Sequence, residues 1–198
     1  MDLQHEFGNI DIYVFDQLLR GRIAAGTRVF DAGCGGGRNL VYLLRHGFEV
    51  CGNDIDPNAV AQVRAMATAI APGPAPDFRV EAIEQTSFPD AHADIVIACA
   101  VLHFARDSDH FGAMVRQMWR VLRPGGLFFA RLASSVGLGP DVAPLGRHQL
   151  PDGSERYLVD AAAIEEWTNR LGGTLLDPIK TTVVHGQRSM TTWVARKA

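Results

Sequence analysis

Residues 28–57 read RVFDAGCGGGRNLVYLLRHGFEVCGNDIDP, and this stretch decides the fold of the chain. The apolar, β-prone residues Val29 and Phe30 precede a glycine-rich turn at 33–37, and a helical pattern follows at 39–45. A second apolar run, at 48–51, stops at a Gly-Asn-Asp sequence that ends in Asp54. This order predicts a strand, a turn, a helix and a second strand, which close a βαβ unit with Asp54 at its carboxyl edge.

A unit of this kind suits a ligand that contains adenosine. Glycines such as Gly33 and Gly35 let the backbone turn tightly and come close to a ligand, because they have no Cβ. The carboxylate of Asp54, at the end of the second strand, can accept hydrogen bonds from both ribose hydroxyls. Two cofactor classes, dinucleotides and S-adenosylmethionine, fit these features.

The glycine spacing and one acid distinguish the two classes. A dinucleotide fingerprint, GxGxxG, needs its third glycine where this chain has Arg38. The pattern is instead DxGxGxG, in which Asp31 stands two residues before Gly33. Its carboxylate would repel a pyrophosphate, whereas it can neutralise the α-ammonium group of S-adenosylmethionine directly or through a water. The charge therefore favours the methyl donor over NAD.

Several ordered segments give the chain a family resemblance. DAGCGGGRN at 31–39 and EVCGNDIDP at 49–57 resemble motifs I and II of the class I S-adenosylmethionine-dependent methyltransferases. VEAIEQTSFPDAHADIVIACAVLHF at 80–104 is similar to the third and fourth motifs, and VLRPGGLFFARL at 121–132 resembles the strand that follows them. The GRN triplet and the small size resemble most the tellurite- and thiopurine-type small-molecule methyltransferases.

The resemblance implies an α/β fold with a Rossmann-like, doubly wound, seven-stranded sheet, mostly parallel, with helices on both faces. The implied strand order is 3-2-1-4-5-7-6, and its C-terminal antiparallel hairpin is predicted at 174–184 and 189–197, on either side of HGQR. Residues 1–198 are expected to form a single methyltransferase domain. Within it, 1–25 holds an N-terminal helix capped by Asn9 and is a candidate lid, and the irregular segment 133–156 is the candidate acceptor-site loop.

The family motifs, carried over onto this sequence, imply a donor site at the carboxyl edge of the sheet. In the family, an acid after the third strand meets the adenine amino group, but Ala82 stands at that place here. The backbone N–H of Ile83 remains, and Glu84 or Gln85 could replace the acid. Ile55 could cover one face of the adenine. The implied cofactor-binding residues are Asp31, Gly33, Cys34, Gly35, Asp54, Ile55, Ile83 and Cys99.

Methyl transfer from S-adenosylmethionine to a small-molecule acceptor, with S-adenosylhomocysteine as product, is an in-line displacement that needs alignment and the exclusion of water. It requires no metal, and a base only if the acceptor arrives protonated. His103 and Tyr13 are candidates for that base, although packing roles explain them as well. The residues expected near the acceptor are Tyr13, His103, Arg131, Arg147, His148 and Arg188, with solvated surface charges as the alternative reading.

Composition excludes several other classes of protein. The net charge is −3 with Lys and Arg scattered along the chain, which disfavours a nucleic-acid partner. The start, MDLQHEFGNI, has no apolar core and no apolar run reaches membrane-spanning length, so the chain is expected to be cytoplasmic without a membrane partner. The three cysteines are isolated in the sequence, which predicts reduced thiols and no metal site.

Three hypotheses for the function remain at this point. The first is a small-molecule methyltransferase, and the second is a nicotinamide-dependent oxidoreductase, which Asp31 and Arg38 oppose. The third is a catalytically silent protein that binds S-adenosylmethionine or a partner. The identity of the acceptor and the oligomeric state do not follow from the sequence.

Overall fold

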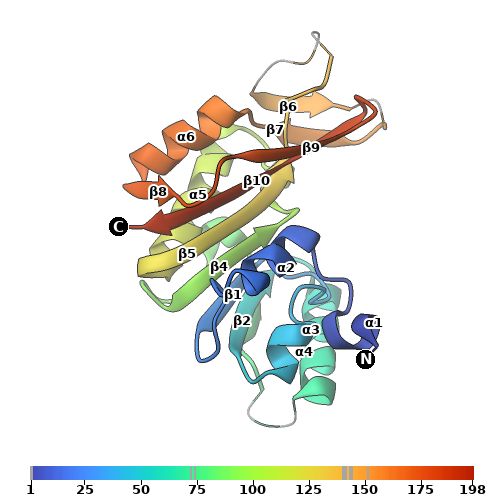
Figure 1. Cartoon of the computed structure of the whole chain (residues 1–198), viewed down its shortest axis with the longest axis vertical. Helices are drawn as coiled ribbons and strands as arrows, with labels where there is room; N and C mark the ends of the chain where they lie inside the picture. Colours follow the sequence, from blue (N-terminus) through green and yellow to red (C-terminus); the bar gives the residue numbers. More distant parts are fainter. Residues whose placement is uncertain (1, 72, 74, 140–141, 143–144, 151) are drawn as a thin grey trace.

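The computed structural model describes residues 2–71, 73, 75–139, 142, 145–150 and 152–198, and its centre is a mixed β-sheet (Figure 1). The sheet order is β3-β2-β1-β4-β5-β10-β8. Along the same edge of β10, residues 195–197 pair with β8 and residues 188–192 pair with β9. The first five strands are parallel, and β10 is antiparallel to both of its neighbours. The bounds are β1 Arg28–Ala32, β2 Glu49–Asp54, β3 Phe78–Val80, β4 Ala93–Cys99, β5 Leu122–Ala133, β8 Gly173–Leu175, β9 Lys180–Val184 and β10 Arg188–Lys197.

This arrangement confirms the predicted α/β fold and its strand order, because β8 and β9 together occupy the place of the sixth strand. The sequence predicts one continuous strand at 174–184, but the structure divides it. Pro178, which has no N–H to donate to a ladder, lies in the interruption. Asp177 beside it is tied to the N-terminal part of the chain by an ion pair with Arg22, 2.8 Å from nitrogen to oxygen.

Five of the six helices in the described part of the chain begin at an Asp, and α3 begins after Leu40 without a side-chain cap. The bounds are α1 Leu3–Phe7, α2 Ile12–Leu19, α3 Val41–Arg45, α4 Pro57–Ile70, α5 Ser108–Val121 and α6 Ala161–Arg170, with 3-10 turns η1 Ile83–Gln85 and η2 Leu102–Phe104. An Asp side chain accepts a backbone N–H of the first turn in α1, α2, α4, α5 and α6. The predicted cap at Asn9 is wrong, since Asp11 caps α2, and Asn9 lies before it.

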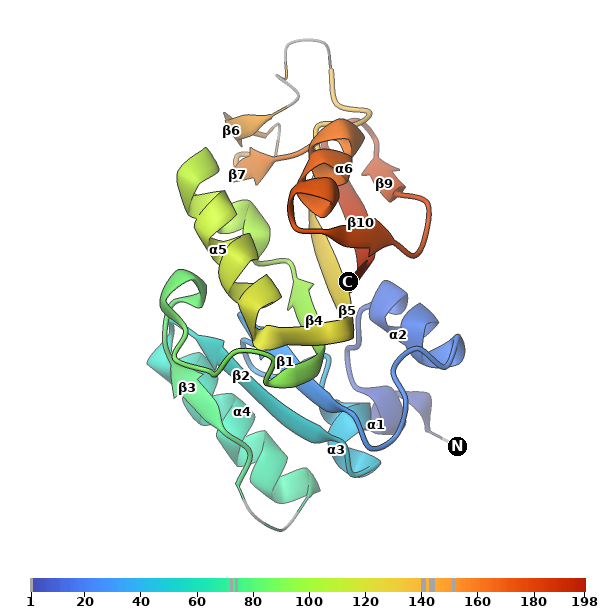
Figure 2. The same ribbon diagram turned by 90° about the vertical axis from the view of Figure 1, so that its left-hand side faces the viewer.

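Helices cover both faces of the sheet because successive strand residues face opposite ways. Ile95 and Ile97 of β4 pack in the core beneath α2, α3 and α4, whereas Val96 and Ala98 pack in the core beneath α5 and α6. Figures 1 and 2 show these helices on the two sides of the strands. The parallel strands are thus buried on both faces, as their nearly continuous apolar sequences predict.

The segment 133–156 is not irregular throughout, which corrects the sequence-based prediction. Its described residues include β6, Gly146–Gln149, which forms an antiparallel pair with β7, Glu155–Leu158. Leu158 and Leu150 pack with Ala133 in a small apolar cluster of their own. The pair therefore has a fixed place above the carboxyl ends of β4 and β5, close to η2, where the loops of a parallel sheet gather.

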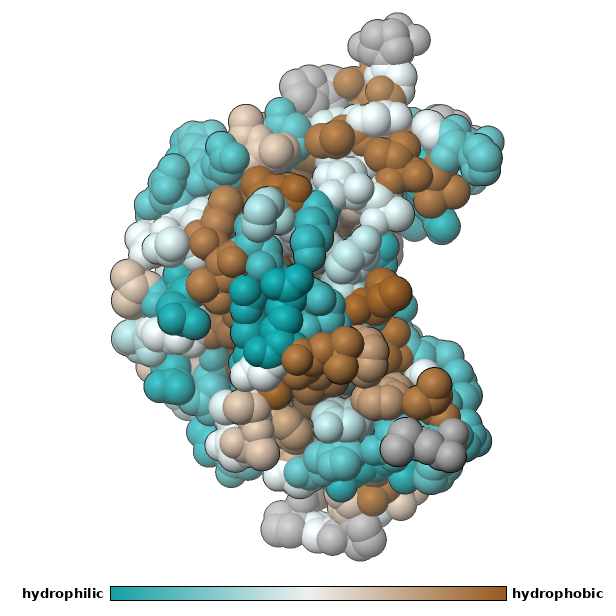
Figure 3. All heavy atoms as spheres, in the orientation of Figure 1, coloured by the Kyte–Doolittle hydropathy of each residue, from teal (hydrophilic) through white to brown (hydrophobic). Residues whose placement is uncertain are grey.

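A hollow opens beside this edge of the sheet. Figure 3 shows it at the right of the molecule, between the part that carries β6 and β9 in Figure 1 and the part that carries α1 and α3. The glycine turn after β1 and the start of β10 contribute to cavities at this edge.

Candidate functional site

The glycine turn after β1 has a conformation that other residues adopt poorly. Gly33 has φ +68°, and a Cβ built on it would lie 2.4 Å from Cγ2 of Val101, so the turn presses directly against the segment after β4. Gly35 also has a positive φ, +51°, but a Cβ there would meet nothing within 4 Å. The surface beside Gly35 is therefore open to a ligand.

Asp54, at the end of β2, holds this turn in place. Its Oδ2 accepts the backbone N–H of Gly35 at 2.8 Å, and its Oδ1 accepts the backbone N–H of Asp56 at 3.0 Å. Asp56 caps α4 through Asn58 N–H, as the sequence predicts. Each carboxylate oxygen of Asp54 has a second lone pair, so the group can still accept a ligand hydroxyl.

Asp31, in β1, is only 2% exposed. Burial raises the pKa of its carboxyl group to about 7, with the charge of Asp54 acting in the same direction and that of Arg38 opposing it. The group is thus poised between its neutral and charged forms near neutral pH, and a cation beside it would favour the carboxylate.

A cavity of about 610 Å³ follows the carboxyl ends of β1, β2 and β4. It lies within the size range of small-molecule sites, about 300–1,000 Å³. Gly33, Gly35, Asp54, Ile55 and Ile83 of the predicted site line it, together with Ala82, Glu84, Ala100, Phe104, His110 and Met114. We call it the donor cavity. Ile55 is 73% exposed, which leaves its side chain free to cover a flat ring. Phe104 is 53% exposed, and Arg156 lies over its ring with Cζ 5.0 Å from the centroid.

A neighbouring hollow of about 400 Å³ continues the donor cavity along the glycine turn. Cys34 and Cys99 line it with Gly33 and Gly35, so the predicted thiols lie at its wall. Burial raises the pKa of the Cys99 thiol to about 12, and Arg38 Nη2 donates to its Sγ at 3.0 Å. Gly8 and Asn9, from the segment between α1 and α2, close the other side.

The place of the missing family acid is occupied by a different pair. Ala82 and Ile83 line the donor cavity, and the side chain of Glu84 lies there with Oε1 2.9 Å from Nε2 of His110. Nδ1 of His110 accepts a hydrogen bond from the backbone N–H of Arg106 at 3.0 Å, so Nε2 is the ring nitrogen that faces Glu84. Gln85, the other predicted substitute, is exposed and not part of the lining.

A further cavity, of about 280 Å³, lies on the other side of Ala100 from the donor cavity. His103, Arg131 and Arg188 of the residues expected near the acceptor line it. Arg147 and His148 do not: both lie on β6, where Arg147 donates to the carbonyl of Ala105 and pairs with Glu155.

The two candidate bases have different surroundings. His103 is buried, and burial, followed by the charge of Arg156, lowers its pKa to about 4, so the imidazole is neutral at pH 7. Tyr13 lies outside the lining of this cavity, where its hydroxyl is 2.8 Å from Oγ1 of Thr182 and its ring lies under Arg131. Of the two candidate bases, only His103 therefore lines the cavity in which the acceptor is expected.

Sequence reasoning missed several residues of these cavities. In the sequence, Arg38 argued only against a dinucleotide fingerprint, yet Arg38 lines both the cavity beside His103 and the hollow beside the glycine turn. Arg156 and His110 were also missed. The one signal available was the position of Arg38 directly after the glycines, because a residue there stays at the carboxyl edge.

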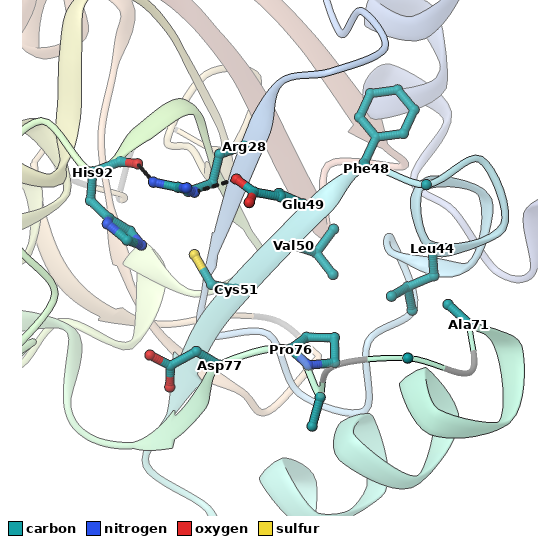
Figure 4. A pocket seen from close by; sticks show the side chains of 13 residues that line it. Arg28, Leu44, Phe48, Glu49, Val50, Cys51, Ala71, Pro76, Asp77 and His92 are labelled. Carbon is teal, nitrogen blue, oxygen red and sulfur yellow. Dashed lines mark hydrogen bonds and ion pairs between the residues drawn. The ribbon is translucent and has the colours of Figure 1, made fainter.

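Another cavity, of about 490 Å³, lies at the opposite end of the strands (Figure 4). Arg28 and Glu49, the first residues of β1 and β2, pair across it at 2.6 Å, and Arg28 also donates to the carbonyl of His92. The predicted cofactor-binding residues lie at the other end of these strands, so this cavity is separate from them.

Metal and membrane features were searched in the part of the chain that the structure describes. There, no group of three or more His, Cys, Asp or Glu side chains is arranged to hold a metal ion. Among the same residues, no helix has both the length and the apolar character needed to cross a bilayer.

Comparison with known proteins points to one family. The family model described as "Methyltransferase domain" matches residues 30–130, about half of the chain. A probable S-adenosylmethionine-dependent methyltransferase of Mycolicibacterium smegmatis is 31% identical over 145 residues, which cover 71% of this chain and 53% of that protein. The chain thus spans about half the length of this curated relative.

Solved structures share the fold at low identity. The 1,6-didemethyltoxoflavin-N1-methyltransferase of Burkholderia thailandensis, with 1,6-didemethyltoxoflavin and S-adenosylhomocysteine bound, has a TM-score of 0.73 at 19% identity and covers 100% of this chain and 81% of its own. The cyclase SpnF has a TM-score of 0.72 at 19% identity, covering 92% and 80%. Since a cyclase and a methyltransferase both match, these likenesses show the architecture alone.

Proposed function

From the premise that this chain belongs to the class I S-adenosylmethionine-dependent methyltransferase family, we propose that it transfers a methyl group from S-adenosylmethionine to a small-molecule acceptor. The observation that carries the proposal is the meeting of two cavities at Ala100, one beside the glycine turn and one beside His103. Ala100 has φ +63°, a strained conformation for a residue with a Cβ, and such strain concentrates at functional sites.

The residues of the donor cavity fit S-adenosylmethionine. The open surface at Gly35 admits a ligand against the backbone, and Asp54 offers acceptor lone pairs for ribose hydroxyls. Ile55 and Phe104 are placed to cover the adenine, with Ile83 N–H and Glu84 as its polar contacts. Cys34 and Cys99 form the wall beside the methionine part. Asp31 is buried and is not in the lining of either cavity, so it would meet the ammonium group of the donor through a water.

The bound donor would supply an electrophilic methyl group on a sulfonium. The chain would then bind and orient both molecules, with Ala100 between them and little water in the closed space. His103, neutral at pH 7, would accept a hydrogen bond from an acceptor hydroxyl, and Tyr13 would position Arg131 rather than touch the acceptor. We assign the 133–156 segment to the acceptor side, since Leu150 lines that cavity.

The N-terminal segment is the proposed cover of the donor. Gly8 and Asn9 line the hollow beside the glycine turn, and Phe7 stacks on Tyr42 of α3 with ring centroids 4.9 Å apart. The likeness to tellurite- and thiopurine-type enzymes remains a prediction about the acceptor. The cytoplasmic location of the protein also remains a prediction.

The experiment that tests the proposal is calorimetry of the purified chain with S-adenosylmethionine, S-adenosylhomocysteine and NAD. We expect saturable heat from the first two and none from NAD, because Asp31 opposes a pyrophosphate. Binding of NAD alone would favour an oxidoreductase. Donor binding without turnover across thiols, amines, hydroxy acids and chalcogen oxyanions would favour the silent binding protein.

A further inference from the structure

The cavity beside His103 carries an unusual set of charges. Four arginines from four separate segments line it: Arg38 after the glycine turn, Arg131 of β5, Arg156 of β7 and Arg188 of β10. The acid in its lining is Asp152. We call it the arginine cavity. Residues so distant in sequence meet only through the fold, at the edge where the donor cavity also opens.

The charges of this cavity do not cancel. Asp11, buried beneath it, lies 2.7 Å from Arg131 and 3.5 Å from Arg38, so one carboxylate serves two guanidinium groups. Asp152 is exposed and accepts hydrogen bonds from Ser154. His103 adds no charge, because its pKa is lowered to about 4. Four positive charges therefore face the two full negative charges of Asp11 and Asp152 and the partial charge of Asp31 near Arg38, and the cavity attracts an anion.

Some buried polar atoms in the lining make no hydrogen bond. Six buried side-chain atoms among the described residues make no hydrogen bond, and three of them belong to this cavity: Nε of Arg131, Nδ1 of His103 and Oγ of Ser189. Ser189 is 1% exposed and His103 6% exposed, so water does not compensate them freely. Leaving such an atom unpaired lowers stability, and a bound polar ligand would supply the missing hydrogen bond.

The remaining wall is apolar. Leu150, Met190 and Ala133 line the same cavity, and Leu150 is buried in the small cluster above β5. The volume, about 280 Å³, is close to the lower limit of small-molecule sites, about 300 Å³. A ligand that matches both walls is small, has an apolar body and carries an anionic group.

We propose that the arginine cavity binds the carboxylate of a small organic acid that also bears a hydroxyl or amine group, and that this acid is the methyl acceptor. The inference rests on the proposed function. The carboxylate, held by arginines, anchors the molecule, and the hydroxyl or amine atom faces Ala100 and the donor. That atom forms the bond to the methyl carbon, the carbon–sulfur bond breaks with its electron pair left on sulfur, and the acceptor proton passes to solvent.

An inorganic oxyanion shares the negative charge but not the apolar body. It would contact the arginines and leave the wall of Leu150 and Met190 unfilled, so the structure favours the organic acid. Selenite and tellurite are therefore separate arms of the test.

The test titrates aromatic and aliphatic hydroxy acids, and the primary amide of each, into protein saturated with S-adenosylhomocysteine. We expect acids to bind at least about tenfold more tightly than their amides, since a charge-assisted bond is worth about 1.5–3 kcal/mol. Arg188→Gln should weaken acid binding about tenfold and leave the affinity for S-adenosylhomocysteine unchanged, because Arg188 lines the arginine cavity and not the donor cavity. Arg196→Gln, an exposed position at the other end of β10, is the matched control and should change neither affinity.

Three results would overturn the inference: no saturable binding of any acid, amides that bind as tightly as acids, or binding confined to selenite or tellurite. An equal loss of acid affinity in Arg196→Gln would also overturn the inference, since it would show that the loss comes from the net charge of the protein. Failure of the proposed function would give a different result, because S-adenosylhomocysteine would then not bind, whereas the acids still could. Methyl transfer to uncharged acceptors alone would refute the inference and leave the proposed function standing.

Discussion

At the scale of single residues, Asp31 is the group whose chemistry depends most on its surroundings. A carboxyl group with a pKa near 7 in the free protein is partly protonated under ordinary conditions. An ammonium group binds the charged form, so binding must release the proton from the fraction that holds it. The residue therefore couples donor affinity to pH.

We expect the affinity for S-adenosylhomocysteine to rise as the pH increases from about 6 to about 7 and then to level off. Below about pH 7 the change should approach tenfold per pH unit, since the proton competes with the ligand. Asp31→Asn should bind more weakly and without this dependence. Calorimetry at several pH values, in buffers of different ionisation heat, measures both affinity and proton release, and a flat profile for the wild type would remove Asp31 from the site.

In the free protein the same shift lowers stability as the pH rises. The folded chain holds the Asp31 proton up to about pH 7, whereas the unfolded chain releases it near the ordinary Asp pKa of 3.8. The unfolded state is thus favoured progressively between these values. Asp31→Asn should lack this contribution, which denaturant titrations at about pH 5 and about pH 8 can compare.

Asp54 has a double role at this scale, because it holds the Gly35 N–H and is the proposed ribose ligand. Asp54→Ala should reduce donor affinity by about 1.5–3 kcal/mol through the loss of charge-assisted bonds. Asp56→Ala removes a neighbouring carboxylate that caps α4 and is its control: it should cost stability with a smaller change in affinity. Unaltered donor binding in Asp54→Ala would place the ribose elsewhere.

At the scale of elements, the glycine turn can be tested against a matched glycine. Gly35 and Gly47 both have positive φ, +51° and +72°, and a Cβ on either meets nothing within 4 Å. Alanine should therefore strain both backbones by about 1 kcal/mol. Only Gly35→Ala should also lose donor affinity, by more than about tenfold, because its methyl group would occupy the ligand's space. Equal affinities in the two variants, measured by calorimetry, would refute this role.

The contact between α6 and β10 depends on one buried hydrogen bond. Nε1 of Trp193 donates to Oγ1 of Thr168 at 2.9 Å, and both residues are buried. Thr168→Val keeps the shape but leaves the indole N–H unpaired, which should lower the free energy of unfolding by about 1–3 kcal/mol. Thr174→Val, at an exposed position of β8, should stay within about 0.5 kcal/mol in the same urea titration. A silent Thr168→Val would show that the N–H finds another partner.

Element boundaries were predictable where a side chain starts or stops an element by itself. Asp56 and Pro57 define the start of α4, and the structure begins that helix at Pro57. The interruption between β8 and β9 was missed, because it depends on Asp177 pairing with Arg22, which is distant in sequence. The β6–β7 pair was missed as well, since its strands are short and lie in a Gly- and Pro-rich segment.

At the scale of the whole molecule, the donor would contact segments that are far apart in the sequence, from Gly8 to His110. A ligand that binds only the folded state stabilises it, by about 2.7 kcal/mol at a hundred times its dissociation constant. S-adenosylhomocysteine should therefore raise the melting temperature by several degrees, and NAD at the same concentration should not. Arg188→Gln should retain the full shift, because the arginine cavity is separate from the donor cavity.

The sequence by itself determined the α/β class and the residues of the glycine turn, because these depend on local patterns, and the strand order followed from the resemblance of its motifs to a known family. Asp31, Gly35 and Asp54 could be named as candidate ligands for the same reasons. Only the tertiary structure brought Arg38, Arg131, Arg156 and Arg188 around one cavity, and only burial moved the pKa values of Asp31 and His103. Charge clustering and desolvation are sums over neighbours that the fold supplies, so no linear pattern encodes them.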